Sequence, residues 1–187
     1  MAVPASNRRW VWFFVTLVLL AAIAISVQVV FSRAQQLRQA DLDAAWQLWK
    51  EKGPANYRLQ FTQRSGSTET YTSWVRGGRV QAVVAQPGRP EEGRPKRRLP
   101  PRLYSYYDMP ALFDSIDQFL KLDRQPGSPR AYNRAIFDPH DGHLLYYRRS
   151  VSRTGQSVEI GSVVVEPEAP GAPLPVEIAA LPEPSED

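Results

Sequence analysis

Both histidines of the chain lie near position 140, close to two acidic side chains. Imidazole and carboxylate groups together bind Zn²⁺ or transfer protons, and such chemistry would involve Asp138, His140, Asp141 and His143. The spacing differs from the helical metal motif, in which two histidines at i and i+4 share one face. Asp141-Gly142 is also a strong hairpin turn signal, which explains Asp141 without catalysis. An envelope hydrolase or metal-binding protein that uses Asp138, His140 and His143 is therefore the alternative interpretation.

A second candidate group consists of basic side chains within residues 86–107. This segment is rich in Pro and Gly, which predicts an exposed loop. Clustered Arg and Lys attract polyanions, because counterions are released when the charges meet. The candidate residues for binding an anion or a partner are Arg94, Lys96, Arg97, Arg98 and Arg102. The partner would be an envelope protein or an anionic polymer. The alternative is a solvated insertion, after which Tyr104, Tyr106 and Tyr107 return to the core.

Motifs of common enzyme classes do not occur in the chain. The sequence contains no GxSxG, HExxH, P-loop or GxGxxG pattern, and it has no cysteine. The missing cysteine excludes disulfides, thiol nucleophiles and thiolate metal sites. The sequence therefore predicts a non-catalytic binding or structural module, with no assigned catalytic residue, metal ligand or cofactor.

The N-terminal part of the chain contains a long apolar segment. No charged side chain occurs from Trp10 to Phe31, and a helix of this length would cover the roughly 30 Å hydrocarbon core of a bilayer. We therefore expect a transmembrane helix over residues 10–31 that contacts the lipid bilayer directly. A cleaved signal peptide is the alternative, but this apolar segment is longer than the 7–15 residues typical of one.

The expected membrane helix also predicts a cellular location. A short basic N-terminal tail normally stays in the cytoplasm, while a long following domain is translocated. This rule predicts a single-pass protein of the bacterial cell membrane, with residues 1–9 cytoplasmic and residues 32–165 forming an extracytoplasmic domain. Nucleic acid is a disfavoured partner for that reason, since the basic loop would lie outside the cell.

Hydrophobic periodicity after residue 31 predicts two helices and several strands. Residues 32–52 and 108–122 have apolar side chains at helical spacing, and Asp108 is a natural N-cap for the second helix. Residues 57–62, 69–76, 79–85, 132–137, 143–151 and 157–165 read as strands, and Gly77-Gly78 and Asp141-Gly142 as hairpin turns. The pattern predicts an α+β domain: a small antiparallel sheet of about five to six strands with two helices packed on one face.

The last residues of the chain differ in composition from the domain. Residues 166–187 are rich in Pro and carry six acidic side chains and no basic one. Such a segment has too little apolar area to offset its ordering entropy, which predicts a disordered, solvated tail. The alternatives are a tail that folds back on the basic domain or binds a partner through Val176 to Leu181.

The order of several short motifs resembles bacterial domain family of unknown function 6174. The motifs are Trp46, Gly53, Asn56-Tyr57-Arg58-Leu59, the Val-Arg-Gly-Gly-Arg-Val hairpin at 75–80, Leu-Phe-Asp-Ser-Ile at 112–116 and Phe-Asp-Pro-His-Asp-Gly at 137–142. The resemblance covers about residues 42 to 165. It implies a small exported or membrane-anchored α+β domain, and it implies no catalytic residues.

Overall fold

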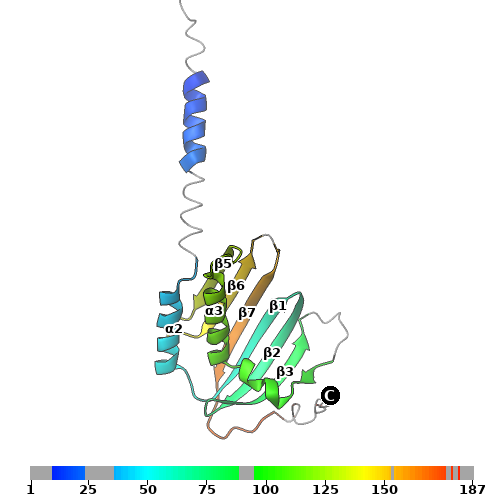
Figure 1. Cartoon of the computed structure of the whole chain (residues 1–187). Coiled ribbons are helices and arrows are strands. Elements are labelled where there is room, and N and C mark those ends of the chain that lie inside the picture. The colour runs from blue at the N-terminus through cyan, green and yellow to red at the C-terminus, as the bar shows by residue number, and fades with distance from the viewer. Residues whose placement is uncertain are drawn as a thin grey trace, which may run out of the picture. The chain divides into compact units, whose positions relative to one another are not determined.

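The computed structural model of the protein describes residues 10–23, 36–88, 95–152, 154–175, 178 and 181. The chain divides into two compact units, residues 1–36 and 37–187. In the first unit, the described residues form one helix over 10–23 (Figure 1). All other helices and strands belong to the second unit.

The predicted membrane span is wrong. Among the described residues, no helix combines the length and the apolar character that crossing a membrane requires. Residues 24–31 of the predicted span lie outside the described residues. This finding removes the basis for the single-pass location in the cell membrane, with its cytoplasmic tail and extracytoplasmic domain.

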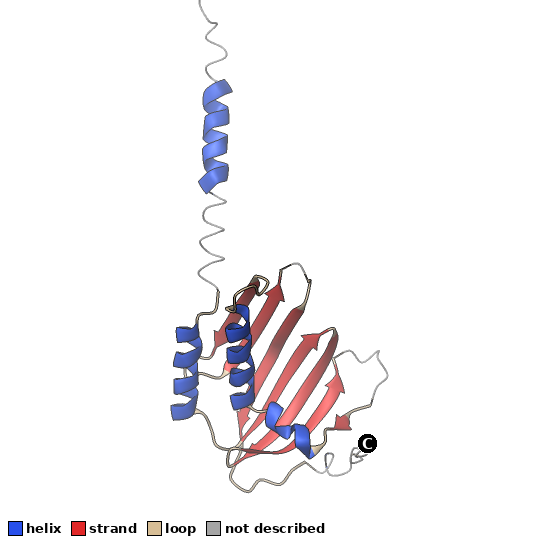
Figure 2. Cartoon of the chain, viewed as in Figure 1, coloured by secondary structure: helices blue, strands red, loops and turns tan. Residues whose placement is uncertain are grey.

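The second unit is an α+β fold built on an antiparallel sheet of seven strands in the order β4-β3-β2-β1-β7-β6-β5 (Figure 2). The strands are β1 (Tyr57–Ser65), β2 (Ser67–Arg76), β3 (Arg79–Pro87), β4 (Arg97–Arg98), β5 (Ala131–Phe137), β6 (Leu144–Val151) and β7 (Ser157–Pro167). The expected count of five to six strands is wrong, because the two-residue strand β4 pairs with β3 inside the predicted loop 86–107.

Two consecutive meanders build this sheet. β1, β2 and β3 form one meander and β5, β6 and β7 the other, and the pairing of β1 with β7 joins them. The turns follow the prediction: Gly77 and Gly78 both have positive φ, the backbone that a tight two-residue hairpin requires. Arg58 of β1 lies opposite Glu166 of β7, so the sheet centre depends on residues far apart in the chain.

Two helices cover one face of the sheet, α2 (Gln39–Lys52) and α3 (Met109–Asp123), together with the short 3-10 helix η2 (Pro101–Tyr106) (Figure 1). Of the apolar side chains at helical spacing in residues 32–52, Leu42, Ala45 and Trp49 are buried at 3%, 8% and 6% exposure, whereas Trp46 is half-buried. α2 begins at Gln39, later than the spacing predicts. α3 begins where predicted, because the Asp108 carboxylate accepts a hydrogen bond from the Ala111 amide over 2.8 Å. This layer and the sheet enclose the main core.

The acidic C-terminal segment contacts the opposite face of the sheet, which differs from the solvated tail that its composition predicts. β7 extends to Pro167, two residues beyond the predicted domain boundary. Ile178 is buried in a cluster with Trp74, Ala82 and Val84. Glu166 forms an ion pair with Arg58 of β1, and Glu168 forms one with Arg76 of β2. The physical reason is that the few apolar side chains of this segment find an apolar patch on β2 and β3, beside arginines of opposite charge.

Candidate functional site

The turn between β5 and β6 brings together Asp138, Asp141 and His143, whose possible ligand atoms all lie within 4.8 Å of one another. His140, which the sequence places in this set, is not part of it. The carboxylates accept hydrogen bonds within the turn: Asp138 Oδ1 from the His140 amide at 2.7 Å and Asp141 Oδ1 from the His143 amide at 3.0 Å. The hydrogen bond from the His140 amide lowers the pKa of the Asp138 carboxyl. These groups therefore act as turn-forming acceptors.

Packing of this turn against α2 supports the same conclusion. A Cβ atom at Gly142 would lie 2.3 Å from the Ala45 carbonyl oxygen and 2.9 Å from the Trp49 amide nitrogen, and Gly142 has a φ of +81°. The ring of His143 contacts the ring of Trp49 edge to face, with centroids 6.4 Å apart. The turn is thus fitted closely to the helix, and His143 is part of that contact.

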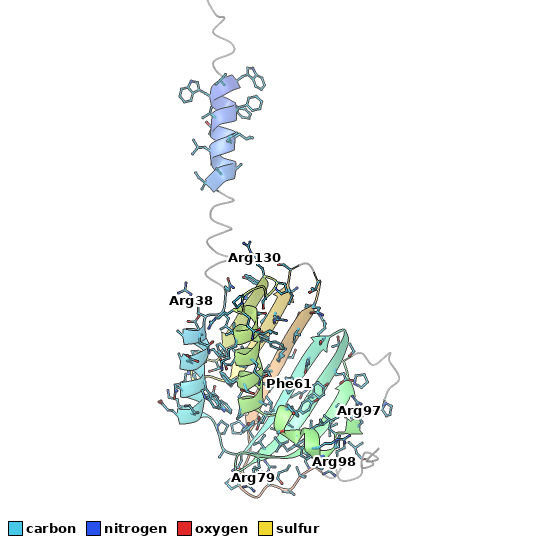
Figure 3. The ribbon with its side chains drawn as sticks, viewed as in Figure 1. Arg38, Phe61, Arg79, Arg97, Arg98 and Arg130 are labelled. Atoms are coloured by element: carbon cyan, nitrogen blue, oxygen red, sulfur yellow. The ribbon has the colours of Figure 1, made fainter. Side chains whose placement is uncertain are left out.

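The predicted basic-loop residues do not converge on one surface. Arg94 lies outside the described residues, and Arg97 and Arg98 form β4 at the sheet edge (Figure 3). Arg97 pairs with Glu69 at 3.2 Å, and Arg98 Nε donates a hydrogen bond to the Tyr104 hydroxyl at 3.1 Å. Arg102 is exposed on η2. Lys96 lines a cavity over the sheet face that α2 and α3 do not cover. The structure therefore distributes these cations over different surroundings.

The tyrosines after the basic loop separate into two groups. Tyr104 and Tyr107 pack against the buried cluster of Val83, Ala85 and Leu99, as the alternative of a return to the core predicts. Tyr106 instead is 65% exposed. Two of the three tyrosines are therefore structural, and they cannot also stack on a ligand.

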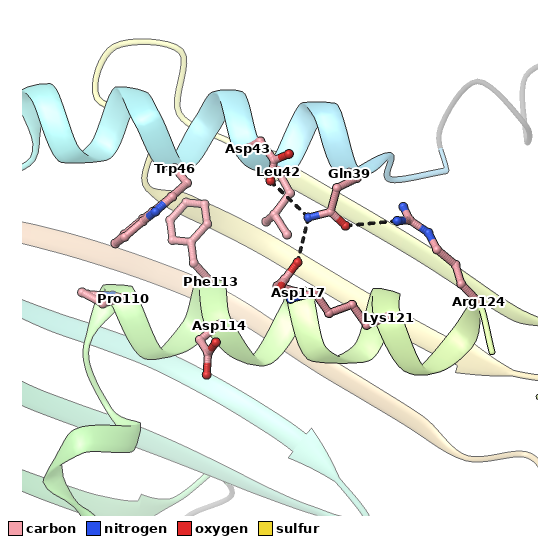
Figure 4. A pocket seen from close by; sticks show the side chains of 10 residues that line it. All are labelled: Gln39, Leu42, Asp43, Trp46, Pro110, Phe113, Asp114, Asp117, Lys121 and Arg124. Carbon is pink, nitrogen blue, oxygen red and sulfur yellow. Dashed lines mark hydrogen bonds and ion pairs between the residues drawn. The ribbon is translucent and has the colours of Figure 1, made fainter.

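A groove between α2 and α3, with a volume of about 570 Å³, is lined by both aromatic and charged side chains (Figure 4). Trp46 and Phe113 lie on its floor, with ring centroids 5.2 Å apart. Gln39 connects the two helices, because its Nε2 donates to Asp117 at 2.7 Å and its Oε1 accepts from Arg124 at 3.3 Å. The polar groups of this groove satisfy one another, which makes the groove a seam between two helices.

Further along α3, the side chains of the groove are also paired. Lys121 Nζ lies 2.5 Å from Asp117 Oδ2, one helical turn away. The hydrogen bond from Lys121 lowers the pKa of the Asp117 carboxyl, and the same contact raises the pKa of Lys121. Both shifts move the pKa of the group away from neutrality, whereas efficient general acid or base catalysis near neutral pH needs a pKa close to the working pH.

The sheet face opposite the helices carries a lateral row of charged residues. Arg134 of β5 lies opposite Arg148 of β6, Arg148 lies opposite Glu159 of β7, and Glu159 lies opposite Arg64 of β1. We call these four residues the arginine row. Their sequence neighbours Asn133, Tyr147 and Ile160 are buried beneath the helices. Since side chains alternate along a strand, the row faces away from the helix layer.

Apolar and aromatic side chains flank the arginine row on the same face. Tyr132 and Ile136, two positions on either side of Arg134 in β5, are 38% and 43% exposed. Tyr146 lies opposite Ile136, and its ring approaches the backbone of Gly161, where no side chain intervenes. The flanks and the row together form a mixed apolar and cationic surface.

Sequence reasoning did not select Arg64, Arg134 or Arg148. The available signal was the alternation of side chains between the two faces along β5 and β6. This alternation places Arg134 and Arg148 on the face opposite the buried side chains. Alternation gives the face of a residue but not its neighbour on the next strand. Only the register of the sheet shows that the arginines adjoin one another.

Comparisons of the chain with protein-family models, with curated proteins and with solved structures find no match. The resemblance to domain family 6174 accordingly stays a prediction, and the function must be argued from the residues of the chain.

Proposed function

We propose that this protein is a non-catalytic binding module that recognises an acidic segment of another protein through the arginine row. Binding is favoured over catalysis because the side chains of the predicted hydrolytic or metal site, Asp138, Asp141 and His143, are used to form and pack a turn. In contrast, neither Arg134 nor Arg148 forms a hydrogen bond or an ion pair with a described residue, whereas Arg64 approaches Glu159 and donates a hydrogen bond to Thr68.

The observation that carries the proposal is the position of Arg134 directly opposite Arg148. Directly opposed residues on one face of an antiparallel pair have Cβ atoms about 4.5–5.5 Å apart, and like charges at that distance destabilise a sheet. Glu159 is the single acid in the row, and it has an arginine on each side. Arg64 Nη1 approaches Glu159 Oε2 only to 4.0 Å. The row therefore keeps an excess of positive charge that a bound carboxylate would neutralise.

The chemistry of the row selects its partner. Guanidinium groups bind carboxylates with two parallel hydrogen bonds, and they lose less hydration than ammonium groups do. Protein interfaces are enriched in Arg and Tyr, and Tyr132 and Ile136 flank Arg134 in β5 with half-exposed apolar surface. A polypeptide that combines acidic and apolar side chains would match both components. A polyphosphate or a nucleic acid would match only the charges.

A binding experiment with the full chain tests the proposal. Fluorescein-labelled deca-glutamate is titrated with the protein at low ionic strength, and fluorescence anisotropy reports binding. We expect saturable binding that weakens with added salt, since salt screens exposed charges. The double substitution Arg134→Gln/Arg148→Gln should reduce the affinity at least tenfold, because each charge-assisted hydrogen bond contributes about 1.5–3 kcal/mol.

A matched control separates this site from general charge. The variant Arg79→Gln/Arg130→Gln removes the same number of charges from the ends of the sheet (Figure 3), and its affinity should stay within about twofold of the unsubstituted protein. Equal losses in both variants would contradict the assignment of the site. A labelled peptide of alternating Glu and Leu should bind more tightly than polyphosphate of the same charge, and the reverse order would contradict the proposed class of partner.

A further inference from the structure

The arginine row carries its charges in a defined order across four adjacent strands. From β5 to β1 the residues are Arg134, Arg148, Glu159 and Arg64, which is two positive charges, one negative charge and one positive charge. Each residue lies directly opposite the next, so the row runs across the strands and not along one of them. A partner that neutralises every member must therefore offer the opposite order: two acids, one base and one acid.

The sheet sets the spacing of the row. Neighbouring strands lie about 4.7–4.9 Å apart, so the four residues span three intervals, or about 14–15 Å. Adjacent strands are also rotated by about 20–25° relative to one another, which the long side chains of Arg and Glu accommodate. A bound segment must therefore present four charged side chains on one side, at intervals close to the distance between strands.

An α-helix has this spacing, and an extended segment does not. Helix residues at i, i+3, i+7 and i+10 lie along one side, and a rise of about 1.5 Å per residue gives them a span of about 15 Å. Side chains on one face of an extended segment recur about every 6.6 Å, so four of them span about 20 Å. An extended segment that crosses the strands would thus lose its alignment with the row, whereas a helix keeps it.

The side chains of the row are accessible to a partner. Arg64 and Arg148 are exposed, and the side chain of Glu159 is 29% exposed. Ile178 of the C-terminal segment reaches the same face of the sheet, but it packs on β2 and β3. These two strands lie on the other side of β1 from β7, β6 and β5. The buried contact of Ile178 therefore leaves the row uncovered.

Glu159 distinguishes the row from a simple patch of positive charge. Its one ion pair with a described residue is the contact with Arg64, in which the two side chains approach only to 4.0 Å. A purely acidic partner would place a carboxylate directly against the Glu159 carboxylate, and opposed like charges disfavour binding. A lysine or arginine of the partner at this position would instead be attracted.

We infer that the partner segment is an α-helix that lies across the strands, with acid, acid, base and acid at positions i, i+3, i+7 and i+10. The acids face Arg134, Arg148 and Arg64, and the base faces Glu159. The gaps of three, four and three residues are symmetric, so a helix of the opposite direction fits with its base at i+3. This inference rests on the proposed function, because it specifies the partner of the same row.

Two labelled, alanine-rich helical peptides of equal composition test the charge order, with fluorescence anisotropy and the full chain. The matched peptide carries Glu, Glu, Lys and Glu at the four positions. The control peptide carries Lys, Glu, Glu and Glu, an order that fits the row in neither direction. We expect the matched peptide to bind at least fivefold more tightly at low ionic strength. Equal affinities, or no binding of the matched peptide, would overturn the inference.

A substitution in the protein tests the role of Glu159. Glu159→Gln removes the charge that the base of the matched peptide faces, so the preference for the matched peptide should decrease at least twofold. Glu51→Gln removes the same charge from an exposed position on α2 and should leave the preference unchanged. An equal preference in Glu159→Gln and in the unsubstituted protein would overturn the assignment of the base.

A third peptide tests the helical conformation. Proline in place of a central alanine of the matched peptide breaks the helix and keeps every charge. This peptide should bind at least tenfold more weakly, and equal binding would overturn the helix in favour of an extended segment. Failure of this inference is distinguishable from failure of the proposed function. If deca-glutamate binds and Arg134→Gln/Arg148→Gln weakens it, the row remains the site whatever the order of the peptides; if neither deca-glutamate nor the peptides bind, both proposals are wrong.

Discussion

Asp123, the last residue of α3, forms a two-point ion pair with Arg149 in β6. Arg149 Nε donates to Asp123 Oδ2 at 3.0 Å and Nη2 donates to Oδ1 at 2.5 Å. Both side chains are largely buried, at 10% and 11% exposure. Asn133 donates a further hydrogen bond to Asp123 at 2.8 Å and accepts one from the Tyr147 hydroxyl at 2.8 Å. This network connects the helix layer to the sheet.

The substitution Asp123→Ala should strongly destabilise the protein. Removal of one partner of a buried ion pair leaves the other charge uncompensated, which costs about 3–5 kcal/mol. Urea unfolding of the full chain measures the loss. The control is Asp114→Ala on the same helix, where the hydrogen bond from Gln118 is exposed and should account for less than about 1 kcal/mol. Similar losses for both variants would show that Asp123 contributes no more than a surface acid.

The same network predicts a dependence of stability on pH. Burial opposes ionisation of Asp123, but the hydrogen bonds from Arg149 and Asn133 prevail, and the pKa of Asp123 lies below its ordinary value. A lowered pKa in the folded state means that the unfolded chain takes up the proton first as the pH falls. The stabilisation is therefore complete well above about pH 4 and is lost below it. The difference in unfolding free energy between the unsubstituted protein and Asp123→Asn should shrink from pH 6 to pH 3; a constant difference would contradict this account.

The N-cap of α3 should respond to pH in the opposite direction. Burial raises the pKa of the Asp108 carboxyl, although the Ala111 amide donates a hydrogen bond to it. Its ionisation therefore costs stability as the pH rises through the folded pKa. Asp108→Ala should destabilise the protein by about 1 kcal/mol through loss of the cap, whereas Asp108→Asn keeps an acceptor without the charge and should cost less at pH 7. Thermal unfolding of both variants measures the two losses of stability. Equal losses for Asp108→Ala and Asp108→Asn would mean that the cap depends on the charge of Asp108.

The arginine row predicts substitutions that increase stability. Arg134→Gln should stabilise the protein by about 0.2–1 kcal/mol, because it removes the repulsion between opposed like charges. Arg148→Gln should gain less, since it also removes the attraction between Arg148 and Glu159. The double variant should gain less than the sum of the two, since the repulsion can be removed only once. Chemical unfolding at low and high salt measures these effects, which should decrease with salt. A loss of stability in both single variants would indicate that the row is structural.

Glycines in two hairpin turns should differ in their tolerance of a side chain. Gly77 and Gly142 both have positive φ, so substitution by Ala costs about 1–2 kcal/mol at either position. A Cβ at Gly77 would meet nothing within 4 Å, whereas a Cβ at Gly142 would collide with the backbone of α2 at Ala45. Gly142→Ala should therefore be the more destabilising by at least about 1 kcal/mol in urea unfolding. Equal effects would mean that α2 shifts away from the turn without cost.

Features that depend on neighbouring residues were predictable from the sequence. The apolar stripe of α2, the Asp108 N-cap and the hairpins at Gly77-Gly78 and Asp141-Gly142 all follow from spacings of a few residues. These features also led to the α+β class with an antiparallel sheet. Local chemistry determines them, because helix periodicity, capping and turn conformation involve side chains within one or two turns of chain.

Amino-acid composition alone gave a wrong prediction for two segments of the chain. The uncharged segment 10–31 suggested a membrane span that the described helix does not provide. The acidic composition of residues 166–187 suggested full solvation, yet Ile178 is buried against Trp74. Composition describes what a segment contains, whereas burial depends on whether a complementary surface exists elsewhere in the fold.

The sequence by itself determined the helices α2 and α3, the Gly77-Gly78 turn and the face of the sheet that Arg134 and Arg148 occupy. The tertiary structure decided that β1 pairs with β7, that Arg134 lies opposite Arg148, and that Trp74 is covered by residues more than ninety positions later. These relationships join segments far apart in the chain. Their register results from how two meanders and a helix layer share one core, and no local pattern contains that information.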